Sequence, residues 1–249
     1  FIKFGQILST RADLLPPSFI VELSKLVDSV SPEPWELMRA LLTRELGRPP
    51  EELFASIDPQ PMASASLSQV HAGVLRDGQE VVIKVQRPNI AAVIDTDLEI
   101  MASLATSAQS TSLGNIYDLM GIADDFSFTL RNELDYQREG RNADRLRESF
   151  SGQEHLLRIP KVYWELSTQR VLVMERIRGI KISDIPALDA AGYNRHKIAL
   201  NSASVTIKQV LEDGFFHADP HAGNYLIMPG EAIGLVDFGK VGYLRDKDR

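Results

Sequence analysis

The sequence predicts an α+β fold with two lobes and a helical extension at the N-terminus. Three observations carry this prediction. Prolines interrupt a helical region over residues 1–55, a strand-rich segment with inserted helices covers residues 56–178, and a helix, a polar loop and a hairpin fill residues 179–249. With 249 residues, 44% of them hydrophobic, the chain is long enough to bury a substantial core.

The N-terminal region divides into three predicted helices. A pair of prolines ends the first, over residues 1–15, and a second spans residues 18–30. Gly47 is the expected C-terminal stop of a third helix over residues 35–46. Core packing explains the apolar residues that recur in this third helix at helical spacing, namely Trp35, Met38, Leu41, Leu42 and Leu46.

Strands and then helices are predicted in the middle of the chain. Between residues 66 and 85, a turn at residues 76–78 separates two strands, and the second contains Val-Val-Ile-Lys84. Residues 90–150 return to helix, with one apolar stripe formed by Leu119, Ile122, Phe126, Leu130 and Leu134.

A connector is expected to separate the two lobes. Strands over residues 162–164 and 170–174 flank a short turn, and residues 175–179 then loosen into the connector. A helix over residues 195–213, stopped by Gly214, leads into the polar loop.

The polar loop carries the strongest chemical signal. His217-Ala-Asp219-Pro-His-Ala-Gly-Asn224 has the Asp-x-x-x-x-Asn spacing of a kinase catalytic loop, in which the aspartate orients the attacking hydroxyl and the asparagine holds magnesium. Asp237-Phe-Gly would bring a carboxylate to the same ion, because a hairpin between the two motifs returns the chain. A metal pair of His217 and His221 is a weaker interpretation, since Pro220 lies between them and no further ligand has suitable spacing.

Lys84 occupies the place of the kinase strand lysine that contacts phosphates and pairs with a helix glutamate. Three carboxylates on the following helical region are candidate partners: Glu133, Asp135 and Glu139. On one regular helix Asp135 and Glu139 share a face, whereas Glu133 points away from both. One straight helix therefore cannot direct all three at Lys84.

The segment that should cover the phosphates is rich in alanine and serine instead of glycine. Small side chains still permit close approach, although their Cβ atoms restrict the backbone and the serines add hydroxyls. The residues expected to bind nucleotide are Ala63, Ser64, Ala65 and Ser66, together with Lys84 and with Glu175 at the start of the connector.

Composition excludes some functions and leaves others open. A formal net charge of -7 without a cluster of basic residues argues against nucleic-acid binding. The absence of cysteine suits a reducing compartment, and no apolar run is long enough to span a bilayer. Because the chain starts at Phe1 and stops soon after Asp-Phe-Gly, we expect a fragment that truncates the large lobe.

The order of these elements is that of a protein-kinase-like fold. Within it, several motifs resemble the UbiB/AarF family of atypical kinase-like proteins: Lys3-Phe-Gly-Gln6, the Ala/Ser-rich loop ending Gln69-Val-His71, Val-Val-Ile-Lys84, Glu133-Leu-Asp135-Tyr-Gln-Arg-Glu139 and the loop from His217 to Asn224. The resemblance implies binding of ATP or ADP with Mg²⁺. It also implies a role supporting ubiquinone, other prenyl-quinone or isoprenoid lipid biosynthesis, with peripheral or anchored membrane association.

Matching positions assign roles to individual residues. The resemblance implies that Lys84 binds phosphates with Glu139 as its partner, that Asp219 is the catalytic aspartate, and that Asn224 and Asp237 hold magnesium.

The resemblance also implies a regulatory lid, formed by Lys3 and Gln6 over the active site and met by Glu133 and Asp135. Relatives commonly have alanine at the position of Ser64 and glycine at that of Ser68, which affects the expected nucleotide preference.

Two other classes of function remain open. The chain could be a nucleotide-gated module that binds lipid precursors or organises biosynthetic enzymes without transferring phosphate. It could also be a small-molecule kinase of the aminoglycoside-phosphotransferase type, although the Lys-x-Gly-Gln motif and the alanine-rich loop argue against this. The expected location is cytoplasmic or membrane-associated, on the matrix side of a mitochondrion or plastid in a eukaryote.

Overall fold

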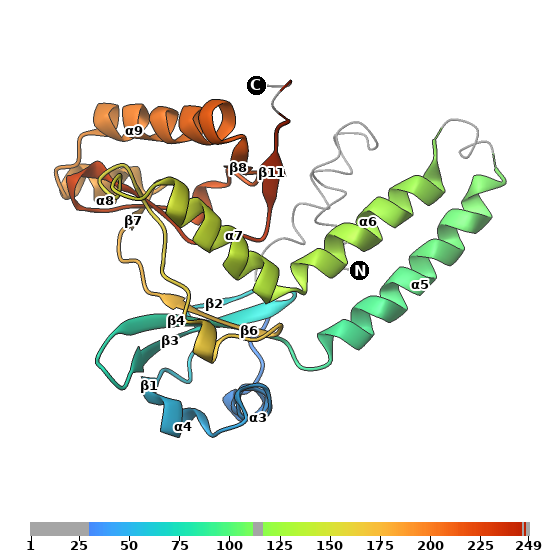
Figure 1. Cartoon of the computed structure of the whole chain (residues 1–249). Coiled ribbons are helices and arrows are strands. Elements are labelled where there is room, and N and C mark those ends of the chain that lie inside the picture. The colour runs from blue at the N-terminus through green and yellow to red at the C-terminus, as the bar shows by residue number, and fades with distance from the viewer. Residues whose placement is uncertain (1–29, 112–116, 246, 248–249) are drawn as a thin grey trace.

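A computed structural model describes residues 30–111, 117–245 and 247 of the chain (Figure 1). Its first sheet has five strands, all paired antiparallel in the order β1-β3-β4-β6, with β2 against β3. These strands are β1 (Phe54–Ile57), β2 (Ala63–Ser64), β3 (Ser68–Leu75), β4 (Glu80–Gln86) and β6 (Val171–Glu175). The predicted turn between β3 and β4 is confirmed, with Gly78 at φ 88°.

Helices α3 (Trp35–Leu46) and α4 (Pro50–Leu53) lie against one face of this sheet (Figure 1). The prediction for α3 is confirmed, including Gly47, which ends the helix in a left-handed conformation at φ 71°. Because side chains alternate along a strand, Val81, Ile83 and Val85 of β4 pack in the core that contains α3, leaving Val82 and Lys84 on the opposite face.

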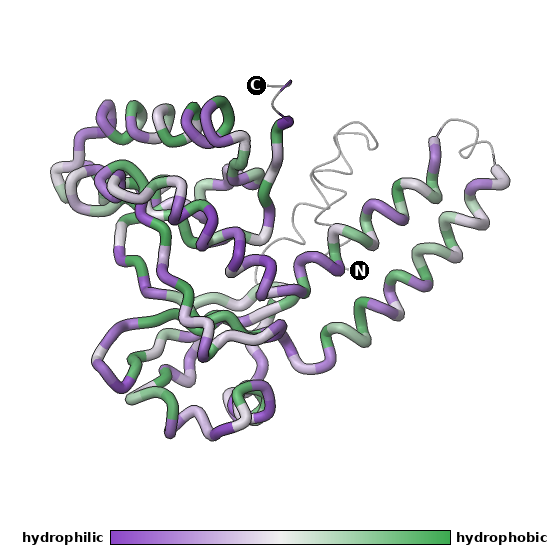
Figure 2. Tube along the Cα trace, viewed as in Figure 1, coloured by the Kyte–Doolittle hydropathy of each residue, from purple (hydrophilic) through white to green (hydrophobic). Residues whose placement is uncertain are grey.

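Two long helices, α5 (Ile90–Gln109) and α6 (Leu119–Glu133), project from the sheet as an antiparallel pair (Figure 1). Hydrophilic and hydrophobic turns alternate along both helices (Figure 2). Their shared core is small and consists of Leu67, Ile94, Leu98, Met101, Phe126 and Leu130. No helix in the described parts of the chain is long and apolar enough to cross a membrane.

The helical region predicted over residues 90–150 is interrupted after residue 133, so residues 133–139 do not form one regular helix. Helix α6 ends at Glu133 and α7 (Tyr136–Ser149) begins three residues later. The side chain of Asp135 causes the restart, since it caps α7 by accepting hydrogen bonds from the backbone N–H groups of Gln137 and Arg138 at 3.1 and 3.3 Å. Glu133 and Glu139 therefore come from two differently directed helices.

A second sheet has four strands in the order β5-β10-β9-β7. They are β5 (Leu157–Arg158), β7 (Ile180–Lys181), β9 (Tyr225–Ile227) and β10 (Ile233–Leu235). The predicted β9–β10 hairpin is confirmed. Strand β5 precedes the connector in sequence yet pairs in parallel with β10, so part of the segment 56–178 lies with the second sheet.

Two further helices and two further strands come from the C-terminal part of the described chain. They are α8 (Ile185–Ala190), α9 (Arg195–Ile207), β8 (Phe215–His217) and β11 (Val241–Tyr243), the last two paired antiparallel. The helix expected over residues 195–213 is present, but its last six residues are π-helical before Gly214 ends it at φ 60°. Helix α7 runs from the first sheet into this second group of elements (Figure 1) and contributes Tyr136, Ala143 and Leu146 to the largest core.

The strand predicted over residues 162–164 is wrong. Val162 makes only an isolated bridge to Met174, and Trp164–Leu166 forms a 3₁₀ turn. The indole N–H of Trp164 donates to Asp144 of α7 at 2.7 Å, and its ring lies against Gly140. These contacts draw the chain away from the sheet, a tertiary effect that local strand propensity does not contain.

Candidate active site

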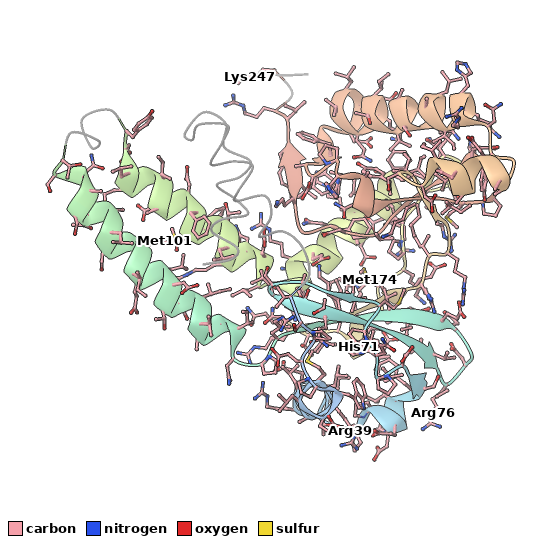
Figure 3. All side chains as sticks on the ribbon, turned by 180° about the vertical axis from the view of Figure 1, so that it is seen from behind. Arg39, His71, Arg76, Met101, Met174 and Lys247 are labelled. Atoms are coloured by element: carbon pink, nitrogen blue, oxygen red, sulfur yellow. The ribbon has the colours of Figure 1, made fainter. Side chains whose placement is uncertain are left out.

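A cavity of about 520 Å³ lies between the two sheets, where the first sheet, α7, the connector and the catalytic loop meet. Met174, labelled in Figure 3, lines it from β6. The cavity gathers most of the residues selected from the sequence: Ala63, Ala65, Ser66, Lys84, Glu133, Glu139, Glu175, Asp219, Asn224 and Asp237.

Lys84 and Glu139 form a buried ion pair in this cavity. The Nζ atom of Lys84 lies 2.8 Å from each carboxylate oxygen of Glu139, and the two side chains are 19% and 4% exposed. Burial opposes the charge on Lys84, but the carboxylates of Glu139 and Asp237 outweigh it and raise the pKa of the lysine. The ammonium group also lies 5.1 Å from the ring centre of Tyr136.

The Asp-Phe-Gly segment is held by one hydrogen bond within the segment and one from helix α7. Asp237 Oδ1 accepts the backbone N–H of Gly239 at 2.9 Å, and Phe238 is fully buried. The Asn142 side chain of α7 donates to the carbonyl of Phe238 at 2.9 Å. The nearby Lys84 ammonium lowers the pKa of Asp237 against the opposing effect of burial, so this carboxylate is ionised at neutral pH.

The catalytic loop folds around the backbone carbonyl of Asp219. That carbonyl accepts hydrogen bonds from the His221 N–H at 2.7 Å and from Asn224 Nδ2 at 3.2 Å. The hairpin then brings Asn224 beside the Asp-Phe-Gly segment, since the Val236 N–H donates to the Asn224 carbonyl at 3.2 Å. The Oδ2 atom of Asp219 lies 3.3 Å from the Nζ of Lys240.

Asn224 and Asp237 fit a magnesium ion by their chemistry. Asn224 uses its amide nitrogen on Asp219, which leaves its side-chain oxygen for a cation, and Asp237 uses one carboxylate oxygen on Gly239. An ionised carboxylate with few other oxygen ligands suits Mg²⁺, which takes its remaining ligands from water and substrate phosphates. No group of three or more His, Cys, Asp or Glu that could hold a metal occurs among the described residues.

His217 and His221 differ in their burial and in their hydrogen bonds. His221 Nδ1 accepts the Gly223 N–H at 3.2 Å, whereas His217 is buried, and burial lowers its pKa.

The alanine- and serine-rich loop presents Ala63, Ala65 and Ser66 to the cavity, but not Ser64. The Ser64 hydroxyl instead accepts a hydrogen bond from the buried guanidinium of Arg87 at 2.8 Å. The same guanidinium donates to the carbonyl of Ala65 at 2.8 Å. Ser64 therefore anchors the loop from behind.

The residues predicted to meet a lid differ in their surroundings. Glu133 lines the cavity, whereas Asp135 caps α7 and lies 3.7 Å from Arg141. Lys3 and Gln6 fall outside the described residues.

Glu175 lines the cavity and binds Arg158 through its carboxylate at 2.5 Å.

Sequence reasoning did not assign a role at the site to Tyr136, Asn142 or Lys240. Asn142 lies three positions after Glu139 and so shares its helix face, a signal that could have been used. Lys240 directly follows Asp-Phe-Gly, but its contact with Asp219 depends on the pairing of β11 with β8. Burial raises the pKa of Tyr136 to about 12, and its position depends on the break between α6 and α7.

A lysine–glutamate pair, an Asp/Asn loop and Asp-Phe-Gly around one cavity between two lobes define a kinase-like protein. More narrowly, the chain belongs to the ABC1 atypical kinase-like domain family, whose profile matches residues 25–249. This confirms both the resemblance drawn from the motifs and the predicted fold class.

Curated relatives and a solved structure agree with this membership. The chain is 44% identical to "Probable protein kinase UbiB" of Marinobacter nauticus, over 100% of this chain and 46% of that protein. It is 41% identical to "Protein ACTIVITY OF BC1 COMPLEX KINASE 7, chloroplastic" of Arabidopsis thaliana, over 98% and 35%. Both alignments span less than half of the relative. The structure of Rv3197 from Mycobacterium tuberculosis, solved with erythromycin, matches with a TM-score of 0.74 at 27% identity, covering 96% of this chain and 60% of that one.

Proposed function

We propose that the chain is the catalytic part of a magnesium-dependent phosphotransferase or ATPase that uses ATP. The observation that supports this most directly is that the Lys84–Glu139 pair shares one cavity with Asp219, Asn224 and Asp237. These residues come from four separate segments of the chain, and they match the parts that phosphoryl transfer requires.

Each side chain has a defined task in this proposal. Lys84, fixed by Glu139, binds phosphate oxygens of the nucleotide, and Ala63, Ala65 and Ser66 line the same cavity. Asp219 orients a hydroxyl group or a water molecule and takes its proton. The oxygen of that group forms a bond to the γ-phosphorus as the bond to the bridging oxygen breaks, and ADP leaves with that electron pair.

Magnesium would be held by Asn224 and Asp237, and when bound it neutralises charge on the β- and γ-phosphates. The protein itself contributes position and charge. Helix α7 supports both halves of the site, because it carries Glu139 against Lys84 and Asn142 against the Asp-Phe-Gly backbone.

The biological context is proposed from family membership. We propose a role that supports ubiquinone, other prenyl-quinone or isoprenoid lipid synthesis, with peripheral membrane association and with lipid precursors or biosynthetic enzymes as partners. We also propose that Lys3 and Gln6 form a lid that meets Glu133 and Asp135. Such a lid would exclude protein substrates and favour slow ATP hydrolysis, autophosphorylation or transfer to a small lipid hydroxyl.

Calorimetric titration with ATP, in the presence and absence of Mg²⁺, tests the site. We expect Asp237→Ala to abolish magnesium-dependent binding, whereas Asp124→Ala, on the exposed face of α6, should bind like the parent. Unchanged affinity of Asp237→Ala for Mg-ATP would contradict the metal assignment.

Phosphate release then separates an enzyme from a nucleotide-gated binding module. We expect measurable release by the parent and at least a hundredfold less by Asp219→Asn, in line with the loss of a positioned proton acceptor, roughly 10²–10⁴-fold. Tight Mg-ATP binding with no release that depends on Asp219 would favour the binding module.

A further inference from the structure

Lys240 lines the cavity and is positively charged, but the proposed mechanism gives it no role. Its Nζ lies 3.3 Å from Asp219 Oδ2, and the two side chains are 44% and 41% exposed, so they meet at the open side of the cavity. The backbone fixes this arrangement, because the Ala218 N–H donates to the Lys240 carbonyl at 3.0 Å and β11 begins at the next residue. Lys240 is thereby tied to the residue that precedes Asp219.

The other cations that line the cavity are placed differently. Lys84 is committed to both carboxylate oxygens of Glu139. Arg176 and Lys181 line the cavity from the connector and from β7. Among the described residues that line this cavity, Lys240 is therefore the lysine held against Asp219.

Its position relates Lys240 to the part of the nucleotide that reacts. If Asp219 takes the proton of the attacking group, that group must be hydrogen-bonded to Asp219 and must lie next to the γ-phosphorus. The γ-phosphate is then close to Asp219, and so close to Lys240. A flexible, partly solvated ammonium can exchange one oxyanion for another at little cost, since lysine behaves as a rotatable point charge.

We propose that Lys240 binds the γ-phosphate of ATP, leaving Asp219 when a triphosphate enters the cavity and returning to it when only ADP is present. Lys240 then has two effects. It favours ATP over ADP, and it covers the Asp219 carboxylate in the absence of a γ-phosphate. The inference rests on the proposed nucleotide site, which it deepens by assigning the contact to the terminal phosphate.

Binding of Mg-ATP and Mg-ADP to the intact chain tests this by calorimetry, independently of turnover. Lys240→Ala should weaken ATP binding about tenfold, the effect of one charge-assisted phosphate contact, with ADP affinity nearly unchanged. Lys240→Arg should keep most of the preference. Lys181→Ala removes another cation from the same cavity and should change the two affinities by the same factor.

Asp219→Asn supplies a second measurement that does not depend on removing the lysine. Without its carboxylate partner Lys240 is free for phosphate, so Asp219→Asn should bind ATP more tightly relative to ADP than the parent does. The gain should vanish in the Asp219→Asn/Lys240→Ala double variant. Equal weakening of ATP and ADP by Lys240→Ala, or no change in either, would overturn the inference while leaving the nucleotide site intact. A parent that binds neither nucleotide would overturn the proposed function and this inference with it.

Discussion

The ammonium of Lys84 contacts both carboxylate oxygens of Glu139 at 2.8 Å across a sequence separation of 55 residues. The pair joins strand β4 to α7, so it links the first sheet to the helix whose Asn142 holds the Asp-Phe-Gly backbone. Mutations can separate the contribution of this pair to the free energy of unfolding from its contribution to nucleotide binding.

Glu139→Ala should lower the free energy of unfolding by about 3–5 kcal/mol, because it leaves a buried lysine without its partner. Replacing both residues, as Lys84→Met/Glu139→Leu, should recover part of that loss, because Asp237 then lacks the ammonium that keeps it ionised, and neither variant should bind nucleotide. Urea unfolding and calorimetry measure the two effects. The exposed pair Arg39–Glu51 is the matched control (Figure 3 labels Arg39), and Glu51→Ala should leave the unfolding free energy nearly unchanged. A double variant as unstable as Glu139→Ala would show that the residues contribute mainly through packing.

Arg87 should hold the alanine- and serine-rich loop over residues 63–66 in place. Its buried guanidinium donates to Ser64, Ala65, the Ser31 carbonyl and Glu33, the last at 2.7 Å, and a lysine ammonium cannot reproduce that fork. Arg87→Lys should therefore destabilise the chain by about 2–4 kcal/mol, because several part-buried hydrogen bonds are lost at once, and weaken nucleotide binding.

Ser64→Ala and Ser66→Ala distinguish a serine that anchors the loop to Arg87 from one that lines the cavity. Ser64→Ala should cost about 1 kcal/mol of stability with an unchanged ratio of ATP to ADP affinity, since its hydroxyl is not presented to the cavity. Ser66→Ala, in the cavity wall, should alter affinity and leave thermal stability unchanged. A changed ATP to ADP ratio in Ser64→Ala would contradict the anchoring role.

His71 should make the fold sensitive to mild acid. The imidazole, labelled in Figure 3, is fully buried, with Nδ1 2.9 Å from the Asp58 carbonyl and Nε2 3.3 Å from Gln69 Nε2, which suits the neutral ring. Burial lowers its pKa, against the opposing effect of the Asp58 carbonyl. The unfolded chain therefore binds a proton near pH 6.5 while the folded chain resists it, so stability falls as pH drops below about 6.5.

Urea titrations between pH 7.5 and 5.5 measure this dependence. His71→Asn should lower stability at neutral pH and flatten its decline toward acid, whereas His196→Asn, at an exposed position of α9, should decline as steeply as the parent. An unchanged slope in His71→Asn would show that the acid dependence originates elsewhere.

The local sequence determined the helix ends and turns that depend on residues within one segment of the chain. Gly47 and Gly214 end their helices because glycine adopts the left-handed conformation without steric cost, and Gly78 turns the β3–β4 hairpin for the same reason. The motif spacing in the catalytic loop and Asp-Phe-Gly likewise predicted which residues would be brought together, since a short hairpin must return the chain.

Tertiary structure decided what depends on partners distant in the chain. Trp164 leaves the sheet for α7, Ser64 accepts a hydrogen bond from Arg87, and Lys240 meets Asp219 only through the pairing of β11 with β8. In each case a polar side chain had several local options of similar energy, and a partner from another segment selected one. The sequence by itself therefore predicted the residues of the kinase-like site, and the tertiary structure determined which neighbouring side chains orient them.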